Sequence, residues 1–178
     1  MKHVKKIVCS VSAVIALLVT GTVPNNIKVS PQGLELIGNA EQCRLTPYKC
    51  PAGLITNGIG NTHQVSPKPI TLEKVAQDWS SNIESAQNCL AATTNIAALS
   101  QGQIDAFTSF IFNVGCTRYQ HNSNGSETRI YKKLKAGKYD SACRELRFWV
   151  YGDGKRLKGL VIRRKKEMKL CLGSISKA

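Results

Sequence analysis

An uncharged apolar run near the N-terminus constrains this chain most, because it decides in which compartment the remainder folds. The run IVCSVSAVIALLVTGTV extends from Ile7 to Val23. Three basic residues precede it: Lys2, Lys5 and Lys6. Such a pair of regions is typical of export, with the lysines retained in the cytoplasm. The run is shorter than the roughly 20 apolar residues of a stable membrane span. We therefore expect residues 1–24 to form a weakly held signal anchor. A cleaved signal remains the alternative, although no A-x-A cleavage site follows.

The seven cysteines agree with export, because disulfides persist in an oxidising compartment. No C-x-x-C pair occurs, so the sequence predicts neither a metal site nor a cofactor. The only histidines are His3, His63 and His121. An odd number of cysteines leaves at least one thiol outside disulfides in a monomer, which is the expected state. Cys9 lies inside the apolar run, where we expect it to stay reduced until the run leaves the membrane.

The net charge of the chain limits the kinds of partner that it is expected to bind. The chain has 42% apolar and 20% charged residues, with a net charge of +14, which favours a polyanionic partner. Export argues against nucleic acid and leaves a wall polymer or an anionic membrane face. The basic run RLKGLVIRRKKEMK is interpreted first as a solvated helix face, with attraction to such a polyanion as a second role.

The periodicity predicts a mainly helical α+β protein. Residues 25–32 form a linker, and a helix from Gly33 ends at or just before Glu41. The segment GLITNGIGNTH predicts a small β-hairpin centred on Asn57-Gly58, beside Glu41. A long helix over residues 71–92, with Thr71 as N-cap, connects a small lobe (33–70) to a helical lobe (93–178).

The helical lobe begins with a capping box from Ser100 to Gln103. Three further helical stretches are expected: ETRIYKKLKAG, YDSACRELRFWVYG and GLVIRRKKEMKLCLG. Four cysteines of this part are expected to form two structural disulfides of unknown pairing: Cys89, Cys116, Cys143 and Cys171.

The residues that offer chemistry lie in the small lobe. Glycoside hydrolysis needs a proton donor and a second group that activates water or meets the developing positive charge. Glu41 is a candidate donor, with Glu35 as a rival. Cys50 is either half of a structural disulfide with Cys43 or a thiol used as base or nucleophile. Thr56 is either a strand-forming residue or a group that holds water.

Longer motifs resolve part of this choice. NAEQCRLTPYKCPAGLITNGIGNT, FIFNVG and WVYGDGKRLKGLVIRRKKE together resemble the phage-type lysozymes of glycoside hydrolase family 24. The family pattern places Asp after Glu and eight residues, and Thr after five more. Glu41, Cys50 and Thr56 fall on that spacing, which selects Glu41 over Glu35 and puts Cys at the Asp position.

The resemblance implies a lysozyme-like two-lobed fold and an endolysin for host lysis. Such an enzyme hydrolyses the β-1,4 bond between N-acetylmuramic acid and N-acetylglucosamine in peptidoglycan. Glu41 would donate the proton, Cys50 would be base or nucleophile, and Thr56 would orient water or substrate. Three positions depart from the family pattern and bear on substrate contacts: Ile55, Ile59 and Asn61.

Cysteine at the Asp position occurs in signal-anchor-release endolysins, which are tethered to the inner membrane facing the periplasm and then released. By that resemblance, a Cys43–Cys50 disulfide cages the catalytic thiol in the tethered protein. The Cys9 thiol then attacks Cys43 after release, and Cys50 becomes available. The alternative is a permanent Cys43–Cys50 disulfide in which Cys9 has no role.

Three other functions stay open. A lytic transglycosylase needs a single acid and releases an anhydro product. A Cys–His amidase would use Cys50 and His63, although no third orienting group is evident. A membrane-tethered cationic wall-binding or antimicrobial protein needs no catalysis.

Overall fold

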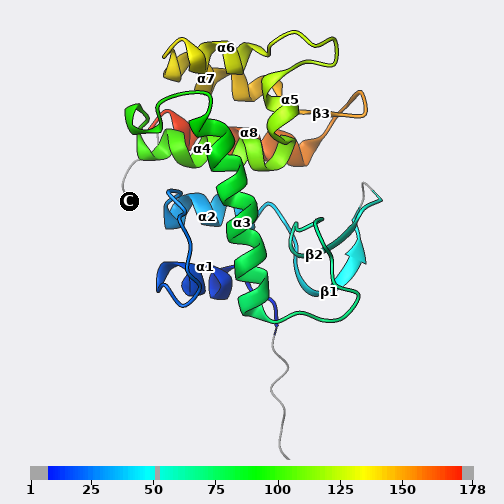
Figure 1. The fold of residues 1–178 in the computed structure, drawn as a ribbon. Helices are drawn as coiled ribbons and strands as arrows, with labels where there is room; N and C mark the ends of the chain where they lie inside the picture. Colours follow the sequence, from blue (N-terminus) through cyan, green and yellow to red (C-terminus); the bar gives the residue numbers. More distant parts are fainter. Residues whose placement is uncertain (1–7, 51–52, 174–178) are drawn as a thin grey trace, which may run out of the picture. The chain divides into compact units, whose positions relative to one another are not determined.

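The computed structural model describes residues 8–50 and 53–173 of the chain (Figure 1). The lysines of the predicted signal, at positions 2, 5 and 6, lie outside them. The chain divides into two compact units. The first contains the residues up to Asn26 together with Gly38–Asn82, and the second contains Ile27–Ile37 together with the residues from Ile83 onward. The order of helices and short antiparallel strands confirms a mainly helical α+β fold.

An antiparallel hairpin dominates the first unit. Strand β1 (Cys43–Lys49) pairs with β2 (Ile55–Ile59), and Tyr48 lies opposite Thr56 (Figure 1). The predicted hairpin is thus present, but the strands are joined through Cys50–Leu54, and Asn57-Gly58 lies within β2. Gly53, with φ +82°, provides the left-handed conformation that the connection requires.

A second, tighter turn follows β2 at once. The backbones of Asn57 and Asn61 exchange two hydrogen bonds of 3.0 Å. Between them, Gly58 and Gly60 have φ +56° and +68°. The Asn57-Gly58 pair therefore does mark a turn. This turn follows β2, whereas the connection that joins β1 to β2 comes before it in the chain.

Helix α1 (Val11–Val19) forms within the apolar run and packs into the core of the first unit. The Thr71 N-cap of α3 (Leu72–Ala91) accepts a hydrogen bond from Lys74 N at 3.2 Å, as predicted. The core of this unit consists of the following side chains: Val14, Ile15, Leu18, Val23, Ile59, Val75, Ala76 and Trp79. Within the described ranges, no helix has the length and apolarity to span a bilayer.

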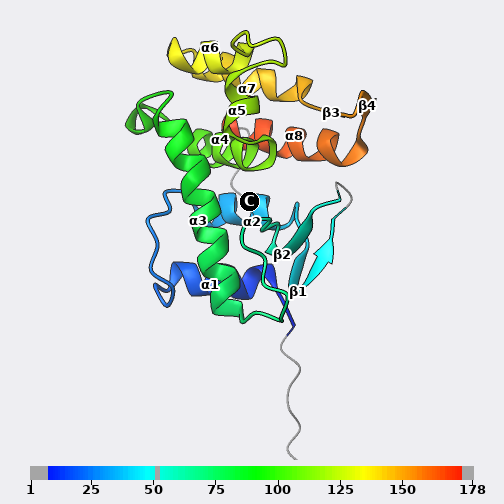
Figure 2. The same cartoon turned by 45° about the vertical axis from the view of Figure 1, so that its right-hand side comes forward.

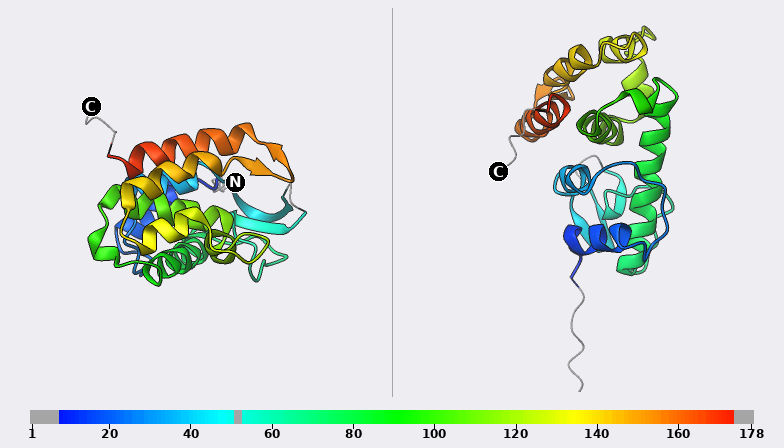
Figure 3. Two further views of the ribbon diagram at one scale, coloured as in Figure 1. Left: turned by 90° about the horizontal axis from the view of Figure 1, so that it is seen from above. Right: turned by 90° about the vertical axis from the view of Figure 1, so that its left-hand side faces the viewer.

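The second unit is helical. It contains most of α2 (Pro31–Gly38), the C-terminal part of α3, and the following helices: α4 (Gln101–Val114), α5 (Cys116–Gln120), α6 (Arg129–Lys135), α7 (Tyr139–Glu145) and α8 (Lys158–Cys171). Two short 3₁₀ helices lie at Ile96–Ala98 and Leu146–Phe148. Helices α4 and α8 pack side by side (Figure 3). The capping box from Ser100 to Gln103 is confirmed at the start of α4.

The predicted helix through WVYG is wrong at its end. Trp149 follows the second 3₁₀ helix, and β3 (Tyr151–Gly152) pairs with β4 (Lys155–Arg156) ahead of α8 (Figure 2). Asp153 and Gly154, with φ +47° and +74°, form the turn of this small hairpin. An Asp-Gly pair is a strong hairpin signal, which here overrides the helical periodicity.

The basic run that follows is only partly a solvated face, which corrects the first interpretation of it. Its exposed cations are Arg156, Lys158, Lys165, Lys166 and Lys169. In contrast, Arg163, Arg164 and Glu167 are buried against α4. Glu167 accepts hydrogen bonds from Ser109 Oγ at 2.7 Å and Arg163 Nε at 3.1 Å, and also pairs with Arg164. A buried ion cluster therefore joins the two helices.

Candidate active site

Glu41 lies in the turn that follows α2, as the sequence predicted. Its backbone N–H donates to the carbonyl oxygen of Gly38 at 3.1 Å, which fixes the turn. Its half-buried carboxyl group lies against Gly60, where a Cβ atom would stand only 3.3 Å from Glu41 Oε2. Gly60 thus leaves space for the carboxyl group. Glu35, the rival acid, is exposed on α2 and belongs to the other unit.

Cys50 and Thr56 flank the connection between the strands. The N–H of Cys50 donates to the carbonyl oxygen of Leu54 at 2.9 Å. The hydroxyl of Thr56 donates to the same oxygen at 3.2 Å. Thr56 is buried and Cys50 is half-buried. Because its proton is directed to Leu54, the Thr56 oxygen keeps its lone pairs for a hydrogen bond from water or a sugar hydroxyl.

Tyr48 connects the two halves of the site electrostatically. Burial raises the pKa of its phenol, and the negative charges of Glu41 and Cys50 raise it further, while Arg44 lowers it. The guanidinium of Arg44 lies over the Tyr48 ring, 4.7 Å from its centroid. Glu41 and Cys50 therefore act on one phenol from the same compact unit.

Amide side chains hold the turn that carries Gly60. Asn61, one of the departures from the family pattern, is buried and donates from Nδ2 to Asn57 Oδ1 at 3.0 Å and to the His63 carbonyl at 2.9 Å. Asn82, from α3, donates to Asn61 Oδ1 at 3.2 Å. These bonds position Gly60 against Glu41. Asn61 therefore has a structural role in this turn.

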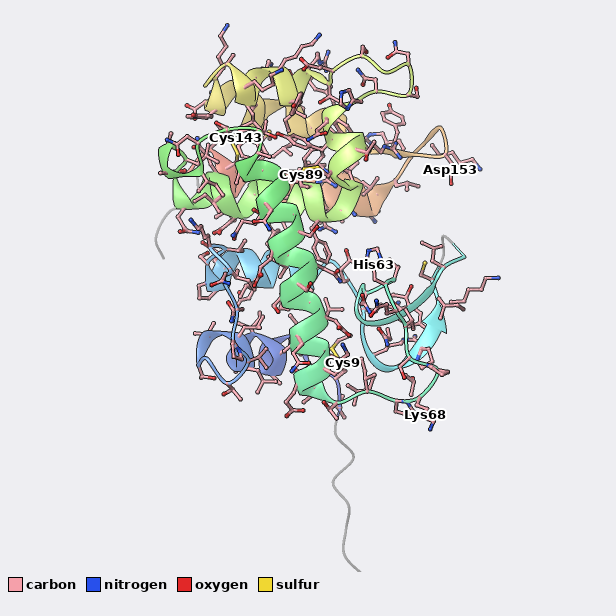
Figure 4. The ribbon with its side chains drawn as sticks, in the orientation of Figure 1. Cys9, His63, Lys68, Cys89, Cys143 and Asp153 are labelled. Carbon is pink, nitrogen blue, oxygen red and sulfur yellow. A yellow bond between two sulfur atoms is a disulfide. The ribbon has the colours of Figure 1, made fainter. Side chains whose placement is uncertain are left out.

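Sequence reasoning missed Arg44, Tyr48 and Gly60 as parts of the site. All three fall within the block NAEQCRLTPYKCPAGLITNGIGNT that carries the family resemblance. The corresponding family block reads F-E-G-x-R-L-x-A-Y-x-D, so Arg44 and Tyr48 fall on its Arg and Tyr and the signal was present. His63 is exposed, and Figure 4 shows it labelled on the segment after β2.

The cysteines form three disulfides in the described residues: Cys9–Cys43, Cys89–Cys116 and Cys143–Cys171. The last two select one of the three connectivities that the sequence left open. Cys9 is bonded to Cys43, with a Cα–Cα distance of 5.4 Å (Figure 4), and Cys50 is in none of these disulfides. This structure thus holds the pairing that the exchange hypothesis assigns to the released protein.

Comparison with known proteins identifies related sequences. The phage lysozyme family model matches residues 38–167. A SAR-endolysin of Escherichia phage P1 is 41% identical over 165 residues, which cover 89% of each chain. A SAR-endolysin of Haemophilus phage HP1 is 41% identical over 152 residues, which cover 82% of each chain.

Solved structures of a phage endolysin are also similar to this chain. The active form of the phage P1 endolysin Lyz superposes with a TM-score of 0.85 at 37% identity, over 97% of this chain and 99% of the other. The secreted inactive form of that endolysin gives a TM-score of 0.58 at 38% identity, over 84% of this chain and 99% of the other.

Proposed function

The chain belongs to the phage lysozyme family, and on that premise we propose that Glu41, Cys50 and Thr56 form the active site of its peptidoglycan-cleaving activity. The family match and the likeness to the phage P1 endolysin confirm the lysozyme-like fold, the endolysin function and the glycosidase class that the sequence predicted. The proposed substrate bond is the β-1,4 bond between N-acetylmuramic acid and N-acetylglucosamine.

Each of the three residues has one role in the proposed reaction: proton donor, base or water-binding group. The protonated Glu41 carboxyl donates its proton to the glycosidic oxygen as the bond to the anomeric carbon breaks. The Cys50 thiolate takes a proton from the attacking water, whose oxygen bonds to the anomeric carbon. Thr56 accepts a hydrogen bond from that water through its remaining lone pairs. In the nucleophilic variant, Cys50 sulfur bonds to the anomeric carbon first, and water displaces it in a second step.

One observation carries this assignment. Cys50 and Thr56 share the Leu54 carbonyl oxygen at one end of β2, and the Glu41 carboxyl group lies against Gly60, which directly follows β2. All three candidate residues therefore gather around one hairpin, within one compact unit.

Product analysis tests the assignment. Purified peptidoglycan digested by the released protein should yield reducing ends without anhydro-muropeptides. Glu41→Gln and Cys50→Ser should each lower the rate by at least roughly 100-fold, the scale of a lost acid or base. Anhydro products together with an active Cys50→Ser variant would favour the transglycosylase. Bacterial killing that survives Glu41→Gln would favour the non-enzymatic cationic protein.

We also propose that the chain is tethered to the inner membrane before release and then acts in the periplasm as a monomer that binds no nucleic acid. The predicted anchor, residues 1–24, includes Cys9. In the tethered protein, a Cys43–Cys50 disulfide would cage the thiol. The Cys9 thiolate would then attack Cys43 sulfur and displace Cys50 as thiolate, with no net oxidation.

The geometry of β1 supports a large difference between the two states. Cys43 begins this extended strand and Cys50 follows its last residue. Such a strand separates its ends by roughly 20 Å, whereas a disulfide requires Cα atoms within about 7 Å. Caging therefore requires β1 to give up its pairing with β2. That would remove Tyr48 from Thr56 and disassemble the site.

Disulfide mapping tests the switch. Peptide mass analysis of membrane-tethered protein should find Cys43–Cys50, and released protein should contain Cys9–Cys43. Cys9→Ser should keep the first pairing after release and remain inactive. A released Cys9→Ser variant with full lytic activity would support the permanent-disulfide alternative.

A further inference from the structure

A catalytic thiol needs a source of positive charge, because the pKa of a cysteine is ordinarily about 8.5 and leaves little thiolate at neutral pH. The residues with titratable side chains near Cys50 can be followed element by element. The connection after it and all of β2 contain none, and α1 contains none. The segment between β2 and α3 contributes the exposed His63 and Lys68 (Figure 4).

Of the remaining titratable groups of this unit, Glu41 is an acid and offers no positive charge, and the others are paired or exposed. In α3, Lys74 is paired with Asp78 at 2.6 Å, and Glu73 is fully exposed. On β1, Lys49 directly follows Tyr48, so its exposed side chain points to the face opposite to the Tyr48 ring. Its Cε lies 3.8 Å from the position that a Cβ on Gly53 would take. Tyr48 and Cys50 both lie next to Thr56: Tyr48 is its partner across the hairpin, and Cys50 shares with it the Leu54 carbonyl oxygen.

Arg44 is also exposed, but it differs from these cations because it has an aromatic partner. Its guanidinium lies 4.7 Å from the centroid of the Tyr48 ring, which is itself half-buried and paired with Thr56 across the hairpin. A cation held over a partly buried ring gains about 0.5–2 kcal/mol. The ring therefore keeps the charge of Arg44 on the side of the hairpin that carries Cys50.

We propose that the Arg44–Tyr48 pair is a positioning element that stabilises the Cys50 thiolate. This rests on the proposed function for its catalytic meaning, but its physical content concerns only the ionisation of one thiol. Tyr48 acts through its ring, as the support for Arg44, and its hydroxyl is dispensable. Both residues belong to β1, so the caged state, in which β1 is broken, would also lose this charge.

Alkylation of Cys50 across pH measures this ionisation without reference to catalysis. In released full-length protein the other cysteines are in disulfides, so intact mass reports a single iodoacetamide adduct. Arg44→Gln should raise the inflection of the rate by roughly 1 pH unit, the scale of one nearby charge. At pH 7 the rate should fall only about threefold, because a thiol of higher pKa is a stronger nucleophile as thiolate.

Matched variants distinguish the effect of the Arg44–Tyr48 pair from the effect of any nearby positive charge. Tyr48→Leu should reproduce the shift of Arg44→Gln, because the support is lost, and Tyr48→Phe should match wild type. Arg44→Lys should lie between, since lysine keeps the charge without the planar group. Lys49→Gln removes the same charge from the opposite face and should leave the inflection in place. Melting temperatures identify any variant that fails to fold, and Arg44→Lys and Tyr48→Phe then decide the comparison.

Three results would overturn the proposal: an unchanged inflection in Arg44→Gln, an equal shift in Lys49→Gln, or an unchanged inflection in Tyr48→Leu. The rising limb of the pH profile for kcat/KM should move with the alkylation inflection, because the base must be deprotonated to act. If Cys50→Ser proved fully active, the proposed function would fail, and the alkylation series would still decide the present inference.

Discussion

Cys50 and Thr56 are joined through one atom, the carbonyl oxygen of Leu54, which accepts the Cys50 N–H at 2.9 Å and the Thr56 hydroxyl at 3.2 Å. This shared acceptor closes the connection between β1 and β2 and fixes both residues relative to each other. The hydroxyl of Thr56 is therefore already oriented before substrate binds, which is the condition for an effective water-holding group.

Substitutions at Thr56 should separate its hydroxyl from its volume. Thr56→Ser keeps the bond to Leu54 and should retain most of the activity. Thr56→Val keeps the shape and removes the hydroxyl, so kcat should fall by on the order of 10–100-fold, while the free energy of unfolding changes by less than about 1.5 kcal/mol. Steady-state kinetics on purified peptidoglycan and urea unfolding check the two parts. Equal kcat for Thr56→Val and Thr56→Ser would assign Thr56 to strand formation alone.

Docking of the anchor helix should depend on Gly38. A Cβ at this position would stand 2.4 Å from Val11 Cγ1 and 3.3 Å from the Trp79 ring. Gly38→Ala should therefore displace α1 at a cost of about 1–3 kcal/mol and lower the fraction of released protein with the Cys9–Cys43 disulfide, as quantified by peptide mass analysis.

Gly159→Ala is the matched control, because this helical glycine on α8 has no neighbour within 4 Å of a new Cβ. It should leave the disulfide fraction at the wild-type value. If Gly38→Ala left that fraction equally unchanged, close packing of α1 against the end of α2 would not be needed for the exchange.

The buried ion cluster of the second unit should dominate its stability. Glu167→Gln leaves Arg163 and Arg164 buried without their carboxylate and should cost about 3–5 kcal/mol. The partly exposed Lys74–Asp78 pair of α3 provides the contrast, since Asp78→Asn should cost less than about 1 kcal/mol. Urea unfolding monitored by circular dichroism measures both. Similar costs for the two variants would contradict a structural role for the cluster.

Tyr119 should limit stability in alkali. It is fully buried, and burial raises its pKa well above the usual value near 10, with Thr93 offsetting part of the effect. A raised pKa means that the folded state holds the proton more tightly than the unfolded state. The stability linked to this group is therefore complete below pH about 10 and is lost as the pH rises further.

Tyr119→Phe removes that loss and should extend the folded state to higher pH. Within the described residues the Tyr119 hydroxyl makes no hydrogen bond of normal geometry, so at pH 7 the change should be neutral or stabilising by about 1 kcal/mol. Tyr151→Phe, at an exposed tyrosine of β3, is the control. Unfolding followed by fluorescence between pH 9 and pH 12 gives the comparison. A Tyr119→Phe curve that overlies wild type would refute the assignment.

The sequence predicted the elements of the fold better than their connections. Helix periodicity and capping placed α3 and α4 correctly, because Thr71 and Ser100 are local signals that tertiary packing did not override. The hairpin connection was misplaced because the Asn57 side chain is used in a buried amide pair with Asn61, which a local turn rule does not contain. Likewise, Arg163 and Arg164 looked solvated, because their partner Glu167 and the packing of α4 against α8 appear only in three dimensions.

In the candidate site, too, the sequence predicted the residues but not the contacts between them. Spacing within the family block selected Glu41, Cys50 and Thr56 from the sequence. It did not show that a glycine at position 60 makes room for the Glu41 carboxyl group, or that Arg44 lies over Tyr48. Those relationships depend on the pairing of β1 with β2, and a one-dimensional pattern contains no such distances.

The most direct test of the central claim, that the Cys50 thiol performs the reaction opposite Glu41, is the rate of peptidoglycan hydrolysis before and after alkylation of released protein. Wild type should lose its activity in proportion to adduct at Cys50. Cys50→Asp, which restores the residue usual in the family, should be active and insensitive to the reagent. Alkylated wild-type protein that still hydrolyses the wall at the original rate would contradict the account.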